Sequence, residues 1–411
     1  MARITRRAAI GSAAAAFTFA PAIVGAQKKY DSGATDKEIK LGHTNPYSGP
    51  LSAYGTIGKA ITGYWQMVND SGGINGRKVT FITYDDGFVP SKTVEMVRKL
   101  VEDDQVFAIY QLLGTPTNTV VQKYLNQKKV PQLFVATGAS KWGMPKEFPW
   151  TMGWQPDYHT EAAIYAKHVL ATWKDRMSEL KIGMLYQNDD SGKDYTGGFL
   201  AGLGKENEKL VTAKVSYEVT DPTVDSQIIQ IKNSGATVFF NDAAPKAAAQ
   251  AIRKVADLGW KPAHYLANVS ASVAAVLKPA GFDNSTGIIT AAYLKDATDP
   301  QWANDADFKE WQAWMKKYLP DANPADSGNT YAYAVSATMR HVLTQCGDTL
   351  TRDNLMKQAA SIKGLEVPLL LPGIKINTSP TDFYPIQSIR LARFDGEKWA
   401  LFGDVLSNES S

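Results

Sequence analysis

Residues that commonly carry enzyme chemistry are few in this sequence, and their spacing matches no catalytic motif. No two histidines have the spacing of the zinc-binding H-E-x-x-H motif, and the chain has a single cysteine, Cys346. There is no G-x-S-x-G motif and no P-loop, and the Gly202–Gly204 segment lacks the third glycine of a dinucleotide-binding motif. We therefore expect a protein that is not an enzyme and that needs no cofactor or metal. The histidines are His43, His159, His168, His264 and His341.

Small and hydroxyl-bearing residues gather instead in two short loops. Gln111–Thr117 leads from an apolar segment into an expected helix, and Ala136–Ser140 follows the next apolar segment. Hydroxyl groups and free backbone N–H groups at a helix N-terminus can bind a carboxylate without a formal cation. The alternative is that these serines and threonines only cap the helices. Taken together, the two loops favour a site for an anionic small molecule.

The elements that must position these loops alternate between strand and helix. The first expected helix has an apolar stripe at Ile57, Ile61, Tyr64, Trp65 and Val68, which lie on one helical face. Such alternation predicts a parallel sheet with helices on both faces, and ligands of such sheets bind beyond the carboxyl ends of the strands. The further expected strands are 79–84, 106–110 and 130–135, and the further helices begin at 90 and 117.

A second alternation of the same kind begins after Trp154-Gln155-Pro156, and the last part of the chain is mainly helical. We therefore predict an α/β fold with two doubly wound units. In the second unit the expected strands are 181–186, 210–219, 238–240 and 264–266, and the expected helices are 160–173, 195–203, 226–232 and 245–258. After these come expected helices at 302–318, 331–345 and 354–360, and strand-like segments at 386–394 and 399–402.

Residues 1–26 have the pattern of an export signal. Three arginines precede an apolar stretch, Ala8–Val24, and a small-residue cleavage motif ends at Ala26. The stretch is too short and too rich in alanine and glycine for a confident transmembrane helix. Arg6 and Arg7 leave a twin-arginine signal open beside the ordinary secretory route. We expect cleavage near Ala26 and a periplasmic location.

The charge balance limits the partners. The chain has 44 basic and 41 acidic residues, and the export signal contains three of the arginines and no acid, so the rest is neutral overall. A nucleic-acid-binding protein would be expected to have a basic stripe, and none is visible. No other apolar run approaches the length of a membrane span. We expect no nucleic-acid partner and no integral membrane segment in the mature chain.

The stretch Leu41–Gly87 resembles a known family. A short strand ends in a Ser-Gly-Pro turn and opens an amphipathic helix, which stops at Gly72-Gly73. An Asn75-Gly76 turn then begins a strand ending at Asp85-Asp86. This pattern is similar to the start of periplasmic solute-binding proteins of the branched-chain amino acid (leucine/isoleucine/valine-binding) ABC importer family, which have the type I periplasmic binding fold.

The resemblance implies two doubly wound parallel-sheet lobes joined by three crossover strands. The first lobe would comprise residues 36–155 plus 291–366. The second lobe would comprise residues 156–290 plus 367–411, so that the helical segment returns to the first lobe and the last strands join the second. The alternative is a row of three consecutive domains.

The resemblance also implies where the ligand's carboxylate is held. In the family, two loops of the first lobe bind it. The matching positions are Gly114 or Thr115 in the first loop, and Ala139 and Ser140 in the second. Tyr54 would cover the ligand from the loop before the first helix.

The second lobe bears on specificity. Amino acid binders of the family place an acidic residue on a loop after the last main strand of this lobe, where it pairs with the α-ammonium group. The matching position here is Asn268. An amide cannot neutralise an ammonium group, and an unpaired buried cation is costly. We therefore expect a carboxylate ligand that lacks the α-ammonium, such as an aromatic or aliphatic acid.

An alternative remains open, in which a neighbouring loop supplies the missing negative charge. Asp189, Asp190 and Asp242 are the candidates for this role, and Ser191 and Asp242 complete the predicted ligand-binding set.

The function implied by the resemblance is capture of a small carboxylate-bearing solute outside the inner membrane and its delivery to the membrane permease of an ABC importer. A free periplasmic ligand sensor of an amide- or amino-acid-type signalling system is the alternative.

Overall fold

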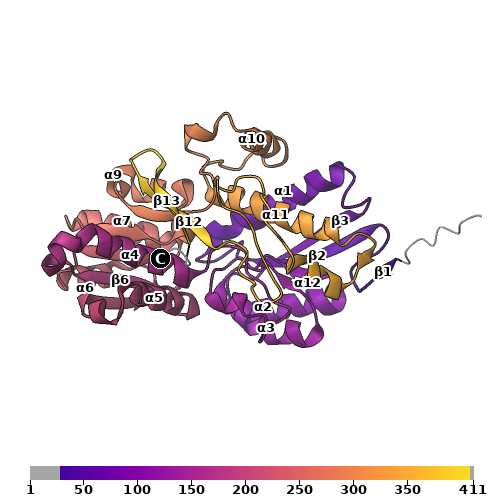
Figure 1. Cartoon of the computed structure of the whole chain (residues 1–411), viewed down its shortest axis with the longest axis horizontal. Coiled ribbons are helices and arrows are strands. Elements are labelled where there is room, and N and C mark those ends of the chain that lie inside the picture. Colours follow the sequence, from indigo (N-terminus) through magenta and orange to yellow (C-terminus); the bar gives the residue numbers. More distant parts are fainter. Residues whose placement is uncertain (1–27, 408–411) are drawn as a thin grey trace, which may run out of the picture.

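The computed structural model describes residues 28–407, and the expected export signal lies outside these described residues. Two lobes, each built on its own sheet, lie side by side along the longest axis of the molecule (Figure 1). Helices α4–α7 belong to one lobe, and α1–α3 belong to the other. No helix within residues 28–407 combines the length and the apolar character that a membrane span requires.

The first lobe contains a four-stranded sheet in the order β3-β2-β4-β5, and every neighbouring pair is parallel. Helices connect its strands, as a parallel sheet requires. The strands are β2 (Glu38–Asn45), β3 (Lys78–Asp85), β4 (Ala108–Tyr110) and β5 (Gln132–Leu133), and the helices are α1 (Gly55–Asp70), α2 (Pro90–Arg98) and α3 (Thr115–Lys128).

Helix α1 shows how the local sequence forms these elements. All five residues of its predicted apolar stripe are buried. The helix ends at Asp70, and Gly72 and Gly73 follow with φ angles of 96° and 75°, which glycine adopts without a steric cost. Asn75 and Gly76 also have positive φ angles, so the chain turns tightly and enters β3.

The second lobe contains a seven-stranded sheet in the order β13-β12-β10-β9-β8-β6-β7. Strands β6 to β10 are parallel, whereas β12 runs antiparallel to both β10 and β13. The strands are β6 (Ile182–Gln187), β7 (Val211–Tyr217), β8 (Val238–Asp242), β9 (Ala263–Leu266), β10 (Ile289–Ala292), β12 (Ser388–Phe394) and β13 (Trp399–Ser407). The helices are α4 (Tyr158–Trp173), α5 (Asp190–Leu203), α6 (Asp225–Asn233), α7 (Pro245–Asp257) and the short α8 (Lys278–Ala280) and α9 (Phe282–Ser285).

The chain passes between the lobes more than once. After β10 it forms α10 (Ala306–Tyr318), α11 (Ser327–Gln345) and α12 (Arg352–Ala359), and both α10 and α11 pack against α1 of the first lobe. It then returns to form β12 and β13 in the sheet of the second lobe. On these two passages Leu294 and Leu370 form an antiparallel bridge. The residue bounds assigned above to each lobe stay a prediction.

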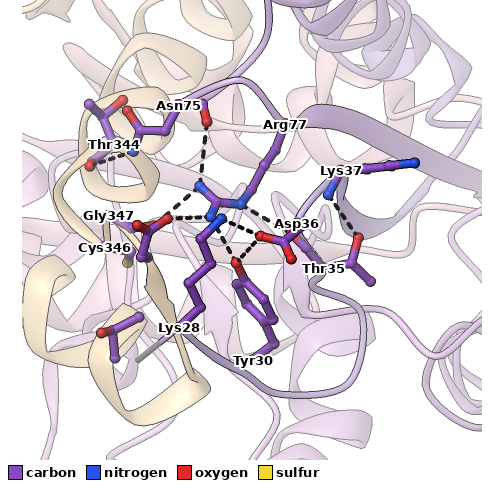
Figure 2. A network of polar contacts seen from close by, with 12 residues as sticks. Lys28, Tyr30, Thr35, Asp36, Lys37, Asn75, Arg77, Thr344, Cys346 and Gly347 are labelled. Carbon is purple, nitrogen blue, oxygen red and sulfur yellow. Dashed lines mark hydrogen bonds and ion pairs between the residues drawn. The ribbon is translucent and has the colours of Figure 1, made fainter. Parts of the chain in front are cut away.

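The beginning of the described chain is fixed to the first lobe. Strand β1 (Lys29–Tyr30) pairs with β11 (Thr349–Leu350), and the side chain of Arg77 lies between the two segments (Figure 2). Its guanidinium forms an ion pair of 2.5 Å with Asp348 and donates a hydrogen bond of 3.0 Å to the Tyr30 hydroxyl. Because a planar guanidinium can serve several acceptors at once, Arg77 joins three distant segments of the chain.

Candidate ligand-binding site

A cavity lies between the two lobes and is lined by both of them. Loops of the first lobe form one wall, and the carboxyl ends of the strands of the second lobe form the opposite wall. This is the position at which open parallel sheets bind ligands. The lining residues include Tyr54, Phe88, Gly114, Thr115, Gln155, Tyr158, Gln187, Ser191, Tyr195, Asp242, Ala244, Asn268, Tyr293 and Tyr331.

The wall formed by the first lobe contains the N-terminus of α3. Gly114 precedes this helix with a φ angle of 97°, and a Cβ at this position would lie 2.2 Å from the Phe88 ring. A glycine is therefore required here on two independent grounds. Thr115 begins the helix and shares a hydrogen bond of 2.5 Å with the Thr137 hydroxyl. The positive end of the helix dipole faces the cavity and favours an anionic group of a ligand.

The wall formed by the second lobe contains residues that end or follow neighbouring parallel strands. Gln187 ends β6 and Asp242 ends β8, and these two strands pair with each other. Asn268 follows β9, the strand on the other side of β8. Three polar side chains from separate segments thus meet at one edge of the sheet.

Helix α5 begins at Asp190, five residues before the position expected from the sequence, because Asp189 caps it. The Asp189 carboxylate accepts hydrogen bonds from the backbone N–H groups of Ser191 and Gly192, at 2.9 and 3.2 Å. Ser191 is thereby placed at the cavity. Its hydroxyl donates a further hydrogen bond of 2.5 Å to Asp189.

Two donor groups of Asn268 are engaged within the protein. Its backbone N–H donates to the Glu161 carboxylate at 2.8 Å, and its side-chain amide donates to the Ala291 carbonyl at 2.5 Å. Glu161 is buried and also accepts hydrogen bonds from Tyr165 and Tyr195. Burial raises the pKa of Glu161 to about 7, although the three hydrogen bonds favour its ionised form.

Asp242 stands in a different environment. Its side chain is buried, and its Oδ2 atom has no hydrogen-bond partner among the described residues. Burial raises the pKa of Asp242 well above its usual value, and the carboxylates of Asp189, Glu161 and Asp194 raise it further. An unsatisfied buried carboxyl group is costly, so this atom is suited to a partner that comes from outside the chain.

Aromatic side chains form much of the cavity wall. The rings of Tyr158 and Tyr195 are stacked with their centroids 4.2 Å apart. The Tyr331 hydroxyl donates a hydrogen bond of 3.2 Å to the Gln155 side chain, and the Tyr54 hydroxyl donates one of 3.2 Å to the Val269 carbonyl of the opposite lobe. Ring faces of this kind suit an apolar ligand body.

Six of the eight predicted site residues line the cavity, and two do not. The six are Tyr54, Gly114, Thr115, Ser191, Asp242 and Asn268. Ala139 is buried in the core, and Ser140 donates hydrogen bonds to Asp194 of the second lobe, so neither residue belongs to the cavity wall. Contact of any of these residues with a ligand stays a prediction.

Several cavity residues were missed from the sequence. Phe88, Tyr158, Tyr195 and Tyr293 lie on different segments, and no spacing in the sequence connects them. Gln187 could have been predicted from the sequence, because it directly follows the expected strand 181–186 and ligands bind beyond the carboxyl ends of such strands.

The two lobes contact each other around the cavity. Besides the bond from Tyr54 to Val269, Lys141 of the first lobe forms an ion pair of 2.9 Å with Asp190 of the second. On the other side, Ser272 donates a hydrogen bond of 3.2 Å to Asp326, the residue that caps α11. The structure therefore represents a form in which the lobes are closed on each other.

A cavity enclosed between two parallel-sheet lobes, which the chain joins by repeated passages, defines the class of two-lobed binding proteins with the type I periplasmic binding fold. A family model described as a periplasmic binding protein matches residues 38–398. The chain belongs to the periplasmic binding protein family, whose members bind solutes.

Individual relatives agree with this assignment. The chain is 25% identical over 319 residues to the Leu/Ile/Val-binding protein homolog 3 of Brucella melitensis biotype 1. The alignment covers 76% of this chain and 80% of the relative. The structure is also similar to that of a branched-chain amino acid ABC transporter protein from Thermus thermophilus, which was solved with bound valine. The TM-score is 0.78 at 14% identity, and the superposition covers 90% of this chain and 97% of the other. An ABC transporter solute-binding protein from R. palustris, in complex with 4-hydroxybenzoate, has a TM-score of 0.74 at 18% identity and the same coverage.

Proposed function

We propose that this protein is the extracytoplasmic substrate-binding component of an ABC importer. It captures a small carboxylate-bearing solute between its lobes and delivers the solute to a membrane permease. The observation that carries the proposal is the cavity between the lobes, with the N-terminus of α3 in one wall and the ends of β6 and β8 in the other. We place the protein in the periplasm after removal of residues 1–26.

The carboxylate of the solute is assigned to the wall of the first lobe. Thr115 offers a hydroxyl group there, and the first turn of α3 adds the helix dipole. Lys295 also lines the cavity, but its ammonium group already binds Asp305 and Asp307 at 2.8 and 2.7 Å. Neutral donors therefore hold the anion. The solutes named for the two structural relatives, valine and 4-hydroxybenzoate, are both carboxylates, which supports this class of ligand.

Binding is proposed to be coupled to lobe closure. A ligand shifts the equilibrium between open and closed forms only by its difference in affinity for the two. A solute that touches Thr115 on one lobe and Ser191 on the other has that difference, because both contacts exist only when the lobes are closed. The closed form would then present the joined surface of the two lobes to the permease.

A thermal-shift screen of residues 27–411 tests the proposal. The panel contains branched-chain and aromatic amino acids, their keto-acid analogues, benzoate-type acids, short aliphatic acids and amides. A ligand at about 100 times its dissociation constant stabilises the folded state by about 2.7 kcal/mol, which is a shift of a few degrees for a protein of this size. A shift with at least one carboxylate is expected. Shifts with amides alone, or with no member of the panel, would contradict the proposed solute class.

A further inference from the structure

We infer that Asp242 is the counter-ion for a positively charged group of the ligand, so that the solute carries an ammonium or a similar cation in addition to its carboxylate. The inference deepens the proposed function and rests on it. It favours the alternative in which a neighbouring loop, and not the position of Asn268, supplies the negative charge.

The charged residues that line the cavity differ in whether the protein itself satisfies them. Asp242 has an oxygen without a hydrogen-bond partner among the described residues, whereas each of the other charged residues that line the cavity has a partner from the protein. Because the chain satisfies the others internally, Asp242 is the charged group left for a ligand. The satisfied residues are Lys295 (with Asp307, 2.7 Å), Asp296 (Thr298 N–H, 2.7 Å), Asp299 (Lys398, 2.8 Å) and Asp326 (Thr56 hydroxyl, 2.8 Å).

The charge around Asp242 is negative. The charged side chains that act on it are Asp189 before α5, Asp194 on α5 and Glu161 on α4, and each of them raises its pKa. No cation among the described residues is a cause of the shift. The groups facing it are otherwise tyrosines, whose phenols are uncharged at neutral pH. This end of the cavity therefore attracts a cation and repels a second carboxylate. The tyrosines are Tyr54, Tyr158, Tyr195 and Tyr217.

Asn268 has a structural role in its loop. Its side-chain amide and its backbone N–H donate to acceptors within the protein, so this position holds the loop in place. Asp242, at the end of the adjacent strand β8, is the acid that reaches the cavity. The negative charge has thus moved by one strand from the position that the family resemblance suggests. A ligand would lie with its carboxylate at Thr115 and its cation at Asp242.

The protonation of Asp242 gives the binding step a measurable consequence. Without a cation, burial and the neighbouring acids favour the protonated carboxyl group. When a ligand ammonium binds, the carboxyl group gives its proton to solvent and becomes the carboxylate of an ion pair. Proton release on binding is therefore expected at any pH at which the empty site still holds this proton.

Isothermal titration with matched probes tests the inference. The probes are L-leucine with 4-methylpentanoate and L-phenylalanine with 3-phenylpropanoate, so that each pair differs by the ammonium group. The proteins are the wild type, Asp242→Asn, and Asp257→Asn, which changes the same charge at an exposed position on α7. Titrations in two buffers of different ionisation enthalpy measure the released protons.

The wild type and Asp257→Asn are expected to prefer the ammonium member of at least one pair. Asp242→Asn should weaken binding of the ammonium member roughly 10- to 100-fold, as expected when a hydrogen bond to a charged group is lost. Binding of the deaminated partner should be unchanged or stronger. Proton release should disappear in this variant. Should Asp242→Asn fail to fold, the preference of the wild type within the two pairs still tests the inference.

Two outcomes would overturn the inference. They are a wild-type preference for the deaminated members and an unchanged preference in Asp242→Asn. The proposed function survives each of these results, because a carboxylate is still bound. If none of the four probes binds but another nitrogen-free acid of the screen does, the inference alone fails. Binding of no carboxylate contradicts both.

Discussion

Ser140 and Asp194 join the two lobes at a point outside the cavity. The Ser140 hydroxyl donates to one oxygen of the Asp194 carboxylate at 2.6 Å, and its backbone N–H donates to the other at 2.8 Å. Ser140 follows the last strand of the first lobe, and Asp194 lies on α5 of the second. Burial raises the pKa of Asp194, while these two hydrogen bonds oppose the rise. The pair thus connects a half-buried carboxyl group to lobe closure.

Replacing Ser140 with alanine should favour the open form. The variant loses the side-chain hydrogen bond to Asp194, which is worth about 1.5–3 kcal/mol for a charged acceptor. Solute affinity is expected to fall roughly 10- to 100-fold, through faster dissociation, although Ser140 does not line the cavity. Stopped-flow binding of the strongest solute of the screen measures both rates. Ser226→Ala, at an exposed position on α6, is the control. Unchanged affinity in Ser140→Ala would show that this contact does not contribute to closure.

Gly114 should tolerate no side chain. Alanine at this position meets Phe88 at 2.2 Å and Thr117 at 2.8 Å, and φ is 97°. We expect Gly114→Ala to lower the free energy of unfolding by about 1–3 kcal/mol. Gly197→Ala is the matched control, because a Cβ there meets nothing within 4 Å and the residue lies inside α5. The control should be neutral or should stabilise by up to about 1 kcal/mol. Urea unfolding measures both, and equal effects would contradict the packing described here.

Glu161 should make stability depend on pH. Burial raises its folded-state pKa from 4.5 to about 7, so the folded protein keeps a proton that the unfolded chain has already released. The proton on Glu161 therefore stabilises the folded state at low pH, and the free energy of unfolding falls by about 3 kcal/mol as pH rises from about 4.5 to about 7. Glu161→Gln does not titrate and should gain stability relative to the wild type over this range.

Urea unfolding at pH 5, 6, 7 and 8 tests this expectation. The difference in unfolding free energy between Glu161→Gln and the wild type should rise with pH and then level off above pH 7. Glu179→Gln, at an exposed position, is the control and should show a constant difference. A constant difference for Glu161→Gln as well would mean that the fold does not hold the proton of this carboxyl group.

Periodicity in the sequence predicted the order of the elements well, because burial of apolar faces decides it. The stripe from Ile57 to Val68 is buried, and Gly114 and Thr115 lie at the carboxyl end of the first sheet, where the loops of a parallel sheet bind ligands. These features depend on residues close together in the chain. Ser140 was expected in the same site, but its partner Asp194 lies 54 residues away on the other lobe, and no local pattern could show this contact.

The sequence could not choose among the three acids that might face a cation. Asp189 is occupied as the cap of α5, and Asp190 forms an ion pair with Lys141 at the edge of the lobes. Asp242 alone of the three lines the cavity. Capping, surface pairing and burial are tertiary properties, so three similar side chains received equal weight until the fold was known.

The central claim is that the cavity between the lobes holds the solute, and filling the cavity tests it most directly. Ala244 lines the cavity just before α7, whereas Ala201 is exposed on α5. Isothermal titration with the panel member that gives the largest thermal shift should show normal affinity for the wild type and Ala201→Trp. It should show no detectable binding to a folded Ala244→Trp variant, since the indole occupies the space of the ligand. Wild-type affinity in Ala244→Trp would place the solute elsewhere and contradict the account.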